Sequence, residues 1–425
     1  MQIKIAPKNK LQGRVQVPGD KSISHRAIMF GALAEGRTVV RGFLRGEDCL
    51  STVSCFRSLG IEIRDDGELL EITGQGLHGL KEPNCLLNTG NSGTTTRLLL
   101  GILAGQNFYS VLAGDQSLCS RPMGRVIKPL SAMGAKIYGR QNNTLAPLTV
   151  LPAELIPGDY ALPVASAQVK SALLLAGMYA DGISSVTEPY LSRDHSERML
   201  RSFGAELETS GLKVQIKGHP KLTGQEITVP GDISSAAFFL VAGAAAKKAE
   251  IVLTNVGLNP TRTGIIDVLK AMGADIEILR EETIAGEPAG DILVKNSSLH
   301  GVNIGGEMIP RLIDEIPILA VAAALAEGET VISDAAELRV KETDRIAAVV
   351  AELRKMGADI TEKPDGMIIR GGQPLHGAEC ENYHDHRMAM ALAVAGLNAD
   401  GETVINGAEC AAVSFPEFFA LLKEL

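Results

Sequence analysis

The sequence predicts an α/β fold built from six copies of one repeat, in which helices pack inside sheets. Two kinds of helical stretch alternate along the chain, and the second kind ends five times at Gly before a short strand-like tail. The first kind lacks a polar face, so it is expected to be buried on nearly every side. Its six versions are KSISHRAIMFGALAEG, NSGTTTRLLLGILAG, ASAQVKSALLLAGMYADG, DISSAAFFLVAGAAA, DEIPILAVAAALAEG and DHRMAMALAVAGLNADG.

The segments between the helices complete each repeat. Short β-branched stretches are expected to form strands, as at residues 38–40, 330–333 and 403–406. The second helices are amphipathic, and the stretch 341–357 is typical of them. Its Gly357 is the expected C-cap before a strand at 358–360. Each repeat is therefore predicted to run β-α-β-α-β-β.

The tetrapeptide Val-Pro-Gly-Asp occurs twice, at 17–20 and at 229–232. One interpretation is that both are copies of a single repeat turn, because Pro followed by Gly ends a strand sharply. The other is that both are crossovers between two lobes, with hinges near 17–21 and 228–232. One lobe would then comprise 1–20 and 229–425, and the other 21–228. Two chain crossings would allow a cleft between the lobes to close.

Composition excludes several classes of function. A net charge of −9 argues against nucleic acid or an anionic membrane as partner, and 4% aromatic residues without Trp argue against base stacking. The longest apolar stretch, 316–326, is far below the ~20 residues that span a bilayer. Because no apolar signal core opens the sequence, a cytoplasmic protein is expected. A monomer is expected as well.

Polar clusters that differ from copy to copy stand at the starts of the first helices. Lys21, Ser22 and Arg26 open the first one, where helix amides, a hydroxyl and two cations would bind an anion. The alternative is an ordinary Ser N-cap with solvated charges. Gly93 lies in a similar cluster, NSGTTTR, and Arg121 precedes a further helix.

Two more clusters allow both a capping and a functional interpretation. Ser166 and Gln168 begin the third apolar run, and Arg193 lies in a later loop. Asp314 precedes a buried helix, where it could be an N-cap or a proton acceptor. The fourth run, DISSAAFF, carries little charge and is interpreted as structural.

The densest charge cluster is RVKETDR, at 339–345. Lys341 and Arg345 are four residues apart and are expected on one helix face, where they could hold a dianion. His386 and Arg387 open the last run and are expected to complete an anion pocket. A metal site is not expected, because His384 and His386 lack a third ligand at helical spacing.

Together, these cations in an acidic protein predict a focused positive cleft for small polyanions. No Walker A pattern occurs, so nucleotide binding through that motif is not indicated. The residues alone therefore predict a two-lobed enzyme for metabolites that carry phosphate and carboxylate groups. Asp314 and Glu342 are its acid/base candidates.

The motifs PGDKSISHR, NSGTTTR, RPMGR, SAQ, SRDH, IDE, LRVKETDR and DHRMAM follow in this order over essentially the whole chain. In this the chain closely resembles the enolpyruvyl transferases, and among them the branch that acts on shikimate 3-phosphate. The resemblance implies an inside-out α/β barrel of two lobes, each with three βαβαββ repeats. It also implies transfer of the enolpyruvyl group from phosphoenolpyruvate to the 5-hydroxyl of shikimate 3-phosphate, without a cofactor.

The resemblance further implies roles for single residues. Asp314 matches the proton acceptor for the attacking hydroxyl, Glu342 helps to protonate the methylene carbon, and Lys21 touches both substrates. The implied ligands of shikimate 3-phosphate are Lys21, Ser22, Arg26, Ser166, Gln168, Arg193, Asp314 and Lys341. The implied ligands of phosphoenolpyruvate are Lys21, Gly93, Arg121, Gln168, Arg345, His386 and Arg387.

The chain departs from many members of this branch in ways that resemble its second class, which includes glyphosate-tolerant enzymes. Ala167 stands where many members have a second Ser, and Val413 where many have a Lys. Some tolerant members carry Ala at the position of Gly93, and its methyl group crowds glyphosate. Gly93 leaves that room, so at least partial inhibition is expected.

Two alternatives compete with this interpretation. The sister branch acts on UDP-N-acetylglucosamine and has a reactive Cys five residues before an Arg-Pro pair. In this chain Gln116 holds that position relative to Arg121, and KSISHR replaces the Lys-Asn pair of the sister branch. A non-enzymatic repeat scaffold would give no reason for different charge clusters at each helix start.

Overall fold

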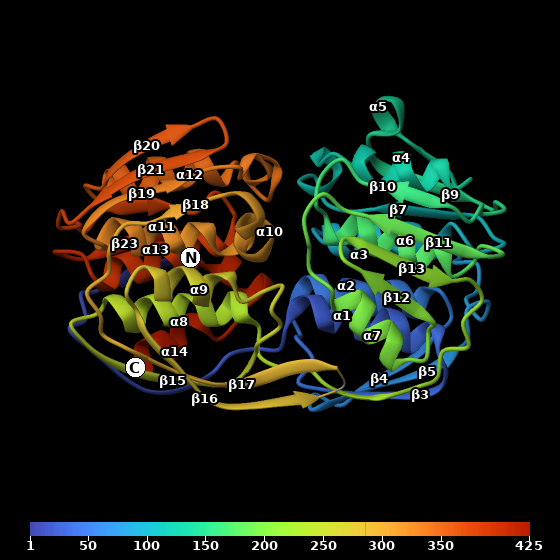
Figure 1. Cartoon of the computed structure of the whole chain (residues 1–425), viewed down its shortest axis with the longest axis horizontal. Helices are drawn as coiled ribbons and strands as arrows, with labels where there is room; N and C mark the ends of the chain where they lie inside the picture. Colours follow the sequence, from blue (N-terminus) through green and yellow to red (C-terminus); the bar gives the residue numbers. More distant parts are fainter. Residues whose placement is uncertain (285) are drawn as a thin grey trace. The chain divides into compact units, whose positions relative to one another are not determined.

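The computed structural model describes residues 1–284 and 286–425. These residues form two units (Figure 1). Unit 1 comprises Met1–Pro18, Pro230–Thr283 and Pro288–Leu425, and unit 2 comprises Gly19–Val229 and the described part of Ile284–Glu287. The main boundaries fall inside the two Val-Pro-Gly-Asp segments.

Three apolar helices lie at the centre of unit 2, where α3 packs against both α6 and α1. They are α1 (Lys21–Leu33), α3 (Gly93–Leu103) and α6 (Ala167–Gly177). α1 is buried continuously from Ile23 to Leu33, because its Ala, Ile, Met, Phe and Leu side chains leave no polar face. The other helices of the unit are α2 (Glu47–Ser58), α4 (Gly124–Ala132), α5 (Arg140–Asn143) and α7 (His195–Ser202).

Three four-stranded sheets belong to unit 2, and they share one strand order. In each, the first two strands are parallel and the other pairs are antiparallel. The first sheet is β14 (Glu226–Thr228), β3 (Glu35–Arg41), β5 (Leu69–Gln75) and β4 (Glu62–Asp65). The second is β6 (Leu87–Asn88), β7 (Ser110–Ala113), β9 (Leu145–Leu151) and β8 (Lys136–Gly139). The third is β10 (Asp159–Ala161), β11 (Ile183–Thr187), β13 (Lys213–Lys217) and β12 (Leu207–Ser210).

Unit 1 is built on the same plan, and its three apolar helices all pack against one another. They are α8 (Ile233–Ala245), α11 (Ile316–Leu325) and α13 (His386–Leu397). Its further helices are α9 (Gly264–Ala271), α10 (Ile309–Leu312), α12 (Arg345–Lys355) and α14 (Phe418–Glu424). The prediction that apolar helices pack inside sheets is thus confirmed in both units.

The sheets of unit 1 repeat this strand order with one exception. One sheet is β2 (Lys10–Gln16), β15 (Lys248–Gly257), β17 (Glu287–Lys295) and β16 (Asp275–Ile284). Another is β18 (Asn303–Ile304), β19 (Gly328–Ile332), β21 (Gly366–Gly371) and β20 (Asp359–Lys363). The last has only three strands, β22 (Glu379–Glu381), β23 (Thr403–Asn406) and β1 (Gln2–Ile5). β1 runs antiparallel to β23, in the place that a closing hairpin fills in the other sheets.

Two sheets take their first strand from a distant part of the chain. β14 follows the third repeat of unit 2 but pairs in parallel with β3 of the first. β2 precedes unit 2 but pairs in parallel with β15, after unit 2 in the sequence. These pairings close each unit as a set of three repeats.

One local expectation is wrong. Lys341 and Arg345 do not share a helix face, because α12 begins only at Arg345 and Lys341 is extended. The reason is the N-cap: the Asp344 carboxylate accepts the Ala347 N–H at 3.0 Å, which fixes the first turn. The predicted C-terminal end is confirmed, since α12 ends at Lys355 and Gly357 follows with φ +91°.

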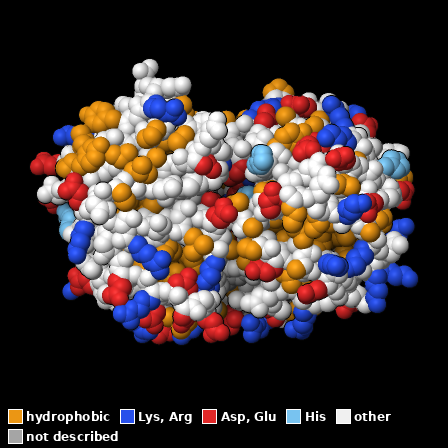
Figure 2. Space-filling view, turned by 180° about the vertical axis from the view of Figure 1, so that it is seen from behind, with side chains coloured by type: hydrophobic (Ala, Val, Ile, Leu, Met, Phe, Trp, Pro, Cys, Tyr) orange, Lys and Arg blue, Asp and Glu red, His pale blue; other side chains and the backbone are white. Residues whose placement is uncertain are grey.

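The surface mixes both signs of charge. On the face shown in Figure 2, Lys and Arg side chains are interspersed with Asp and Glu side chains rather than gathered in one basic field. In the described part of the chain, no helix is both long and apolar enough to cross a membrane.

Candidate active site

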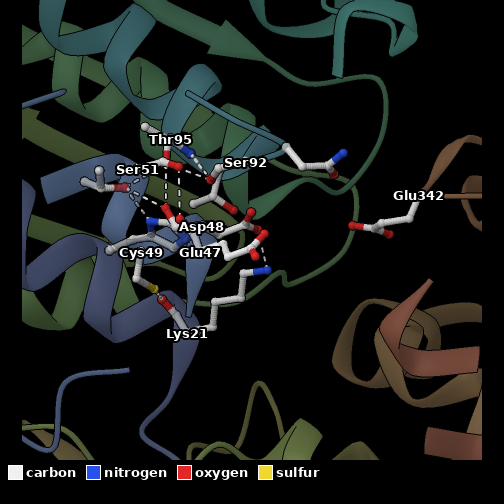
Figure 3. Close-up of polar contacts among 12 residues, drawn as sticks. Lys21, Glu47, Asp48, Cys49, Ser51, Ser92, Thr95 and Glu342 are labelled. Carbon is white, nitrogen blue, oxygen red and sulfur yellow. Dashed lines mark hydrogen bonds and ion pairs between the residues drawn. The ribbon is translucent and has the colours of Figure 1, made fainter. Parts of the chain in front are cut away.

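Lys21 is fixed at the start of α1 by a carboxylate of α2. The Asp20 side chain caps α1 by accepting the Ile23 N–H at 2.8 Å, so Lys21 is the first helical residue. Its Nζ lies 2.5 Å from Oδ2 of Asp48, and both side chains are largely buried (Figure 3). This ion pair holds the ammonium in a defined place, as an anion ligand requires.

A chain of buried side chains connects the KSISHR and NSGTTTR motifs. His25 Nδ1 lies 2.7 Å from the Thr52 hydroxyl, which lies 2.7 Å from the Thr95 hydroxyl. Thr95 donates to the Ser92 hydroxyl at 2.6 Å, and Ser92 caps α3 (Figure 3). The starts of α1 and α3 are therefore held in register by one continuous network.

Arg26 is buried among neutral partners. Its guanidinium donates to the Ser196 hydroxyl at 2.7 Å, the Ser171 hydroxyl at 2.9 Å and the Ser22 carbonyl at 2.9 Å. Burial lowers the pKa of Arg26 to about 10, and the nearby cation of Arg193 acts in the same direction. Ser22, Arg26 and Arg193 thus lie near one another, with the carboxylates of Glu197, Asp20 and Glu287 close by.

Gly93, Gln168 and Arg121 form a second group in unit 2. Arg97 donates to Gln168 Oε1 at 2.7 Å, and Gln168 Nε2 donates to the Thr94 hydroxyl at 2.9 Å, which fixes the orientation of the amide. A Cβ atom at Gly93 would lie 2.7 Å from Nη1 of Arg97 and 3.7 Å from Nη1 of Arg121. Two guanidinium groups therefore lie beside the backbone of Gly93, an arrangement suited to a small anion.

Ser166 is positioned by a buried ionic cluster. Its hydroxyl caps α6, and its N–H donates to Glu188 Oε1 at 3.0 Å. Lys170 Nζ lies 2.8 Å from Glu188 and 2.7 Å from Glu197, and all three side chains are at most 2% exposed. Burial alone would lower the pKa of Lys170, but the carboxylates of Glu197 and Glu188 raise it above its usual value.

Arg345 joins the predicted acid/base residues in unit 1. Its Nε lies 2.7 Å from Oδ2 of Asp385, and its Nη2 lies 2.7 Å from Oε2 of Glu342. Its Nη1 lies 3.4 Å from Oδ1 of Asp314. The side chain is only 1% exposed. Burial alone would lower the pKa of Arg345, but the carboxylates of Asp385 and Glu342 outweigh burial and raise this pKa above its usual value. Arg345 is therefore a fixed cation that three carboxylates share.

Asp314 lies among several cations. Besides Arg345, Lys341 Nζ lies 3.5 Å from its Oδ1, and Arg387 Nη1 donates to its backbone carbonyl at 3.1 Å. Asp314 lies in a 3₁₀ turn before α11, and Glu315 at the N-cap position makes no side-chain capping bond. Glu315 therefore does not cap α11 through its side chain. His386, the first residue of α13, is 4% exposed.

Several residues that the sequence did not assign to the site complete it. Asp48 holds Lys21, Arg97 orients Gln168, Asp385 holds Arg345, and Glu188 holds Ser166. Arg97 and Asp385 carried a signal, since they lie in the NSGTTTR and DHRMAM motifs used above, whereas Asp48 and Glu188 lie in no such motif. Among the described residues, no three His, Cys, Asp or Glu side chains are arranged to hold a metal ion.

The family model for EPSP synthase (3-phosphoshikimate 1-carboxyvinyltransferase) matches residues 5–422. The chain belongs to the EPSP synthase family. The 3-phosphoshikimate 1-carboxyvinyltransferase of Desulforamulus reducens is 60% identical over 427 residues, which cover 100% of this chain and 99% of that protein. The enzyme of the same name from Pelotomaculum thermopropionicum is 59% identical, with the same coverage. These EPSP synthase relatives favour the shikimate branch over the branch that acts on UDP-N-acetylglucosamine.

Solved structures agree with this family and fold. EPSP synthase from Acinetobacter baumannii superposes with a TM-score of 0.89 at 49% identity, covering 100% of this chain and 98% of that one. The enolpyruvyl transferase NikO from Streptomyces tendae gives a TM-score of 0.81 at 19% identity, covering 99% and 96%. The second likeness concerns the fold alone. The predicted enolpyruvyl transferase fold is confirmed.

The Lys170 cluster makes a stability prediction for this EPSP synthase family member. We expect Lys170→Met to lower the free energy of unfolding by about 3–5 kcal/mol, because it leaves two buried carboxylates without their cation. Urea unfolding at neutral pH measures this loss. Lys213→Met is the matched control: its ion pair with Asp159 has the same 2.8 Å separation but is 37% and 79% exposed. We expect a loss of at most about 1 kcal/mol there. Equal losses in the two variants would contradict the prediction.

His25 makes a prediction about pH. Burial lowers the pKa of His25 well below 6.5, and the cations of Lys21 and Arg26 lower it further. Below about pH 6.5 this histidine binds a proton in the unfolded chain but not in the folded chain. The free energy of unfolding therefore falls as the pH falls, by at most about 1.4 kcal/mol per pH unit. We expect His25→Asn to remove this contribution, so that its free energy of unfolding, from urea titrations between about pH 7 and pH 5, changes less steeply than that of the parent. Parallel pH profiles would contradict this assignment.

Proposed function

We propose that this chain transfers the enolpyruvyl group of phosphoenolpyruvate to the 5-hydroxyl of shikimate 3-phosphate, giving 5-enolpyruvylshikimate 3-phosphate and phosphate. The observation that carries the proposal is the family match over residues 5–422. The charge pattern supports it, because both substrates are anions and the motifs bring together Lys and Arg side chains with a small set of carboxylates.

The proposed ligands of shikimate 3-phosphate are drawn mainly from the starts of α1, α6 and α7 in unit 2. Serine hydroxyls and guanidinium groups suit its phosphate and carboxylate groups. The full set is Lys21, Ser22, Arg26, Ser166, Gln168, Arg193, Asp314 and Lys341.

The proposed ligands of phosphoenolpyruvate come from both units: Lys21, Gly93, Arg121, Gln168, Arg345, His386 and Arg387. Gly93 supports this set because guanidinium groups flank its backbone. Since each unit supplies only some of the ligands, both must present them to the same substrate pair. We propose that the chain crossings near 17–21 and 228–232 act as the hinge for this.

Asp314 and Glu342 are proposed as base and acid. Protonation of the methylene carbon develops positive charge at C2, and the 5-hydroxyl must lose a proton to attack there. Arg345 links both steps, because it contacts Asp314 and Glu342 together. When phosphoenolpyruvate binds the Arg345 guanidinium, it competes with both carboxylates for this cation and places a new anion beside them.

The same proposal includes the oligomeric state of the enzyme, its lack of a cofactor and its location. All proposed ligands belong to one chain, so a monomer is sufficient, and the chemistry needs no cofactor. A cytosolic location fits phosphorylated metabolites, which do not diffuse through membranes.

Phosphate release tests the proposed function. We expect the purified protein to release phosphate from phosphoenolpyruvate with shikimate 3-phosphate as acceptor, and not with UDP-N-acetylglucosamine. Asp314→Asn is the control for a contaminating enzyme, because it keeps the side-chain shape and removes the base. Its kcat should fall by about 10²–10⁴-fold. No release with shikimate 3-phosphate would refute the proposal.

Gly93 makes a prediction about glyphosate. We expect millimolar glyphosate to inhibit the parent protein at low phosphoenolpyruvate, because no methyl group occupies the space beside Gly93. In Gly93→Ala the new Cβ would lie 2.7 Å from Nη1 of Arg97, so that flexible side chain must shift and the space narrows. One methyl group in a fitted pocket changes affinity by about tenfold or more. The concentration for half-inhibition should therefore rise at least about tenfold. A parent protein that resists millimolar glyphosate would contradict this.

A further inference from the structure

The fourth repeat, whose apolar run was interpreted as structural, contains a buried ion pair. Arg262 Nη2 lies 3.0 Å from Oδ1 of Asp232, with side chains 2% and 9% exposed. The same Nη2 donates to the Ser234 hydroxyl at 2.7 Å. Ser234 lies in the first turn of α8 and in turn donates to Oε1 of Glu315. This hydroxyl therefore bridges a guanidinium of the fourth repeat and a carboxylate beside Asp314.

Glu315 faces Arg387 as well. Its Oε1 lies 3.9 Å from Nη1 of Arg387, and that same Nη1 donates to the backbone carbonyl of Asp314 at 3.1 Å. The Glu315 side chain is completely buried, whereas that of Arg387 is 12% exposed. A buried carboxylate needs donors or cations around it. Ser234 supplies a donor and Arg387 supplies a cation.

We propose that Ser234 and Arg262 are positioning residues for phosphoenolpyruvate, acting through Glu315 on Arg387. This inference rests on the proposed function, in which Arg387 binds that substrate. Arg387 is held through Nη1, so its Nε and Nη2 edge is presented to the anion in one orientation. Under this proposal the fourth repeat also positions a substrate ligand, in addition to the structural role that its sequence predicted.

Removal of the Ser234 hydroxyl would change how the Glu315 carboxylate is held. Oε2 of Glu315 has no hydrogen-bond partner among the described residues, and Oε1 would lose its hydroxyl donor. The carboxylate would then turn toward the nearby guanidinium of Arg387. If Glu315 binds Arg387 more closely, Arg387 binds phosphoenolpyruvate less tightly. The effect on shikimate 3-phosphate should be smaller, because only Asp314 and Lys341 of its eight proposed ligands belong to unit 1.

Steady-state kinetics of Ser234→Ala test the inference. We expect KM for phosphoenolpyruvate to rise about tenfold, because a buried acceptor loses its hydroxyl donor, and KM for shikimate 3-phosphate to stay within about twofold. Ser234→Thr keeps the hydroxyl and should restore most of the affinity. Ser235→Ala is the matched control, since Ser235 is also buried in α8 but is not part of this network. It should leave both KM values near those of the parent.

The outcomes separate this inference from the function on which it rests. Turnover in the parent with unchanged KM for phosphoenolpyruvate in Ser234→Ala would overturn the inference alone. A general loss of packing would raise both KM values together, or affect Ser235→Ala equally, and would overturn it too. An inactive parent would remove the proposed function and this inference together.

Discussion

The burial of the apolar helices on all sides is the constraint on which the rest of the structure depends. α11 is an example: every residue from Ile316 to Ala324 is buried. A helix without a polar face can place polar groups only at its ends. Its first N–H groups still need acceptors, and the positive end of its dipole favours anions. Polar chemistry in this chain is therefore concentrated where the apolar helices begin.

A second consequence is that these polar groups are themselves partly or wholly buried. A buried cation without a partner would cost several kcal/mol. Arg345 meets this requirement with Asp385, and Lys170 with Glu188 and Glu197. The proposed ligands therefore rest on a layer of opposite charges. Within each unit, that layer holds the charged side chains in place before a substrate binds.

Local patterns in the sequence were enough to predict the repeats, the apolar helices and the residues at their starts. They could not reveal partners that only the fold brings together. Asp48 is an acidic residue in the first turn of an ordinary helix, and only the contact between α1 and α2 places it on Lys21. Arg262 lies in no motif, yet it reaches Ser234 across the fourth repeat. Likewise, the extended backbone at Lys341 follows from the Asp344 cap, which competes with an earlier helix start.

The same constraint explains why the scaffold repeats while its chemistry does not. Removing methyl or methylene groups from a buried helix body costs about 2–5 kcal/mol for a large residue, so the Ala/Leu pattern tolerates little change. A residue at the helix start has to cap the helix, and the side chains of Asp20, Ser92, Ser166 and Asp232 all do so. Several residue types satisfy that condition. Each copy could therefore acquire different neighbours at its start, as Lys21 beside Asp48 and Ser234 beside Glu315 illustrate, without loss of the packing that holds the repeats together.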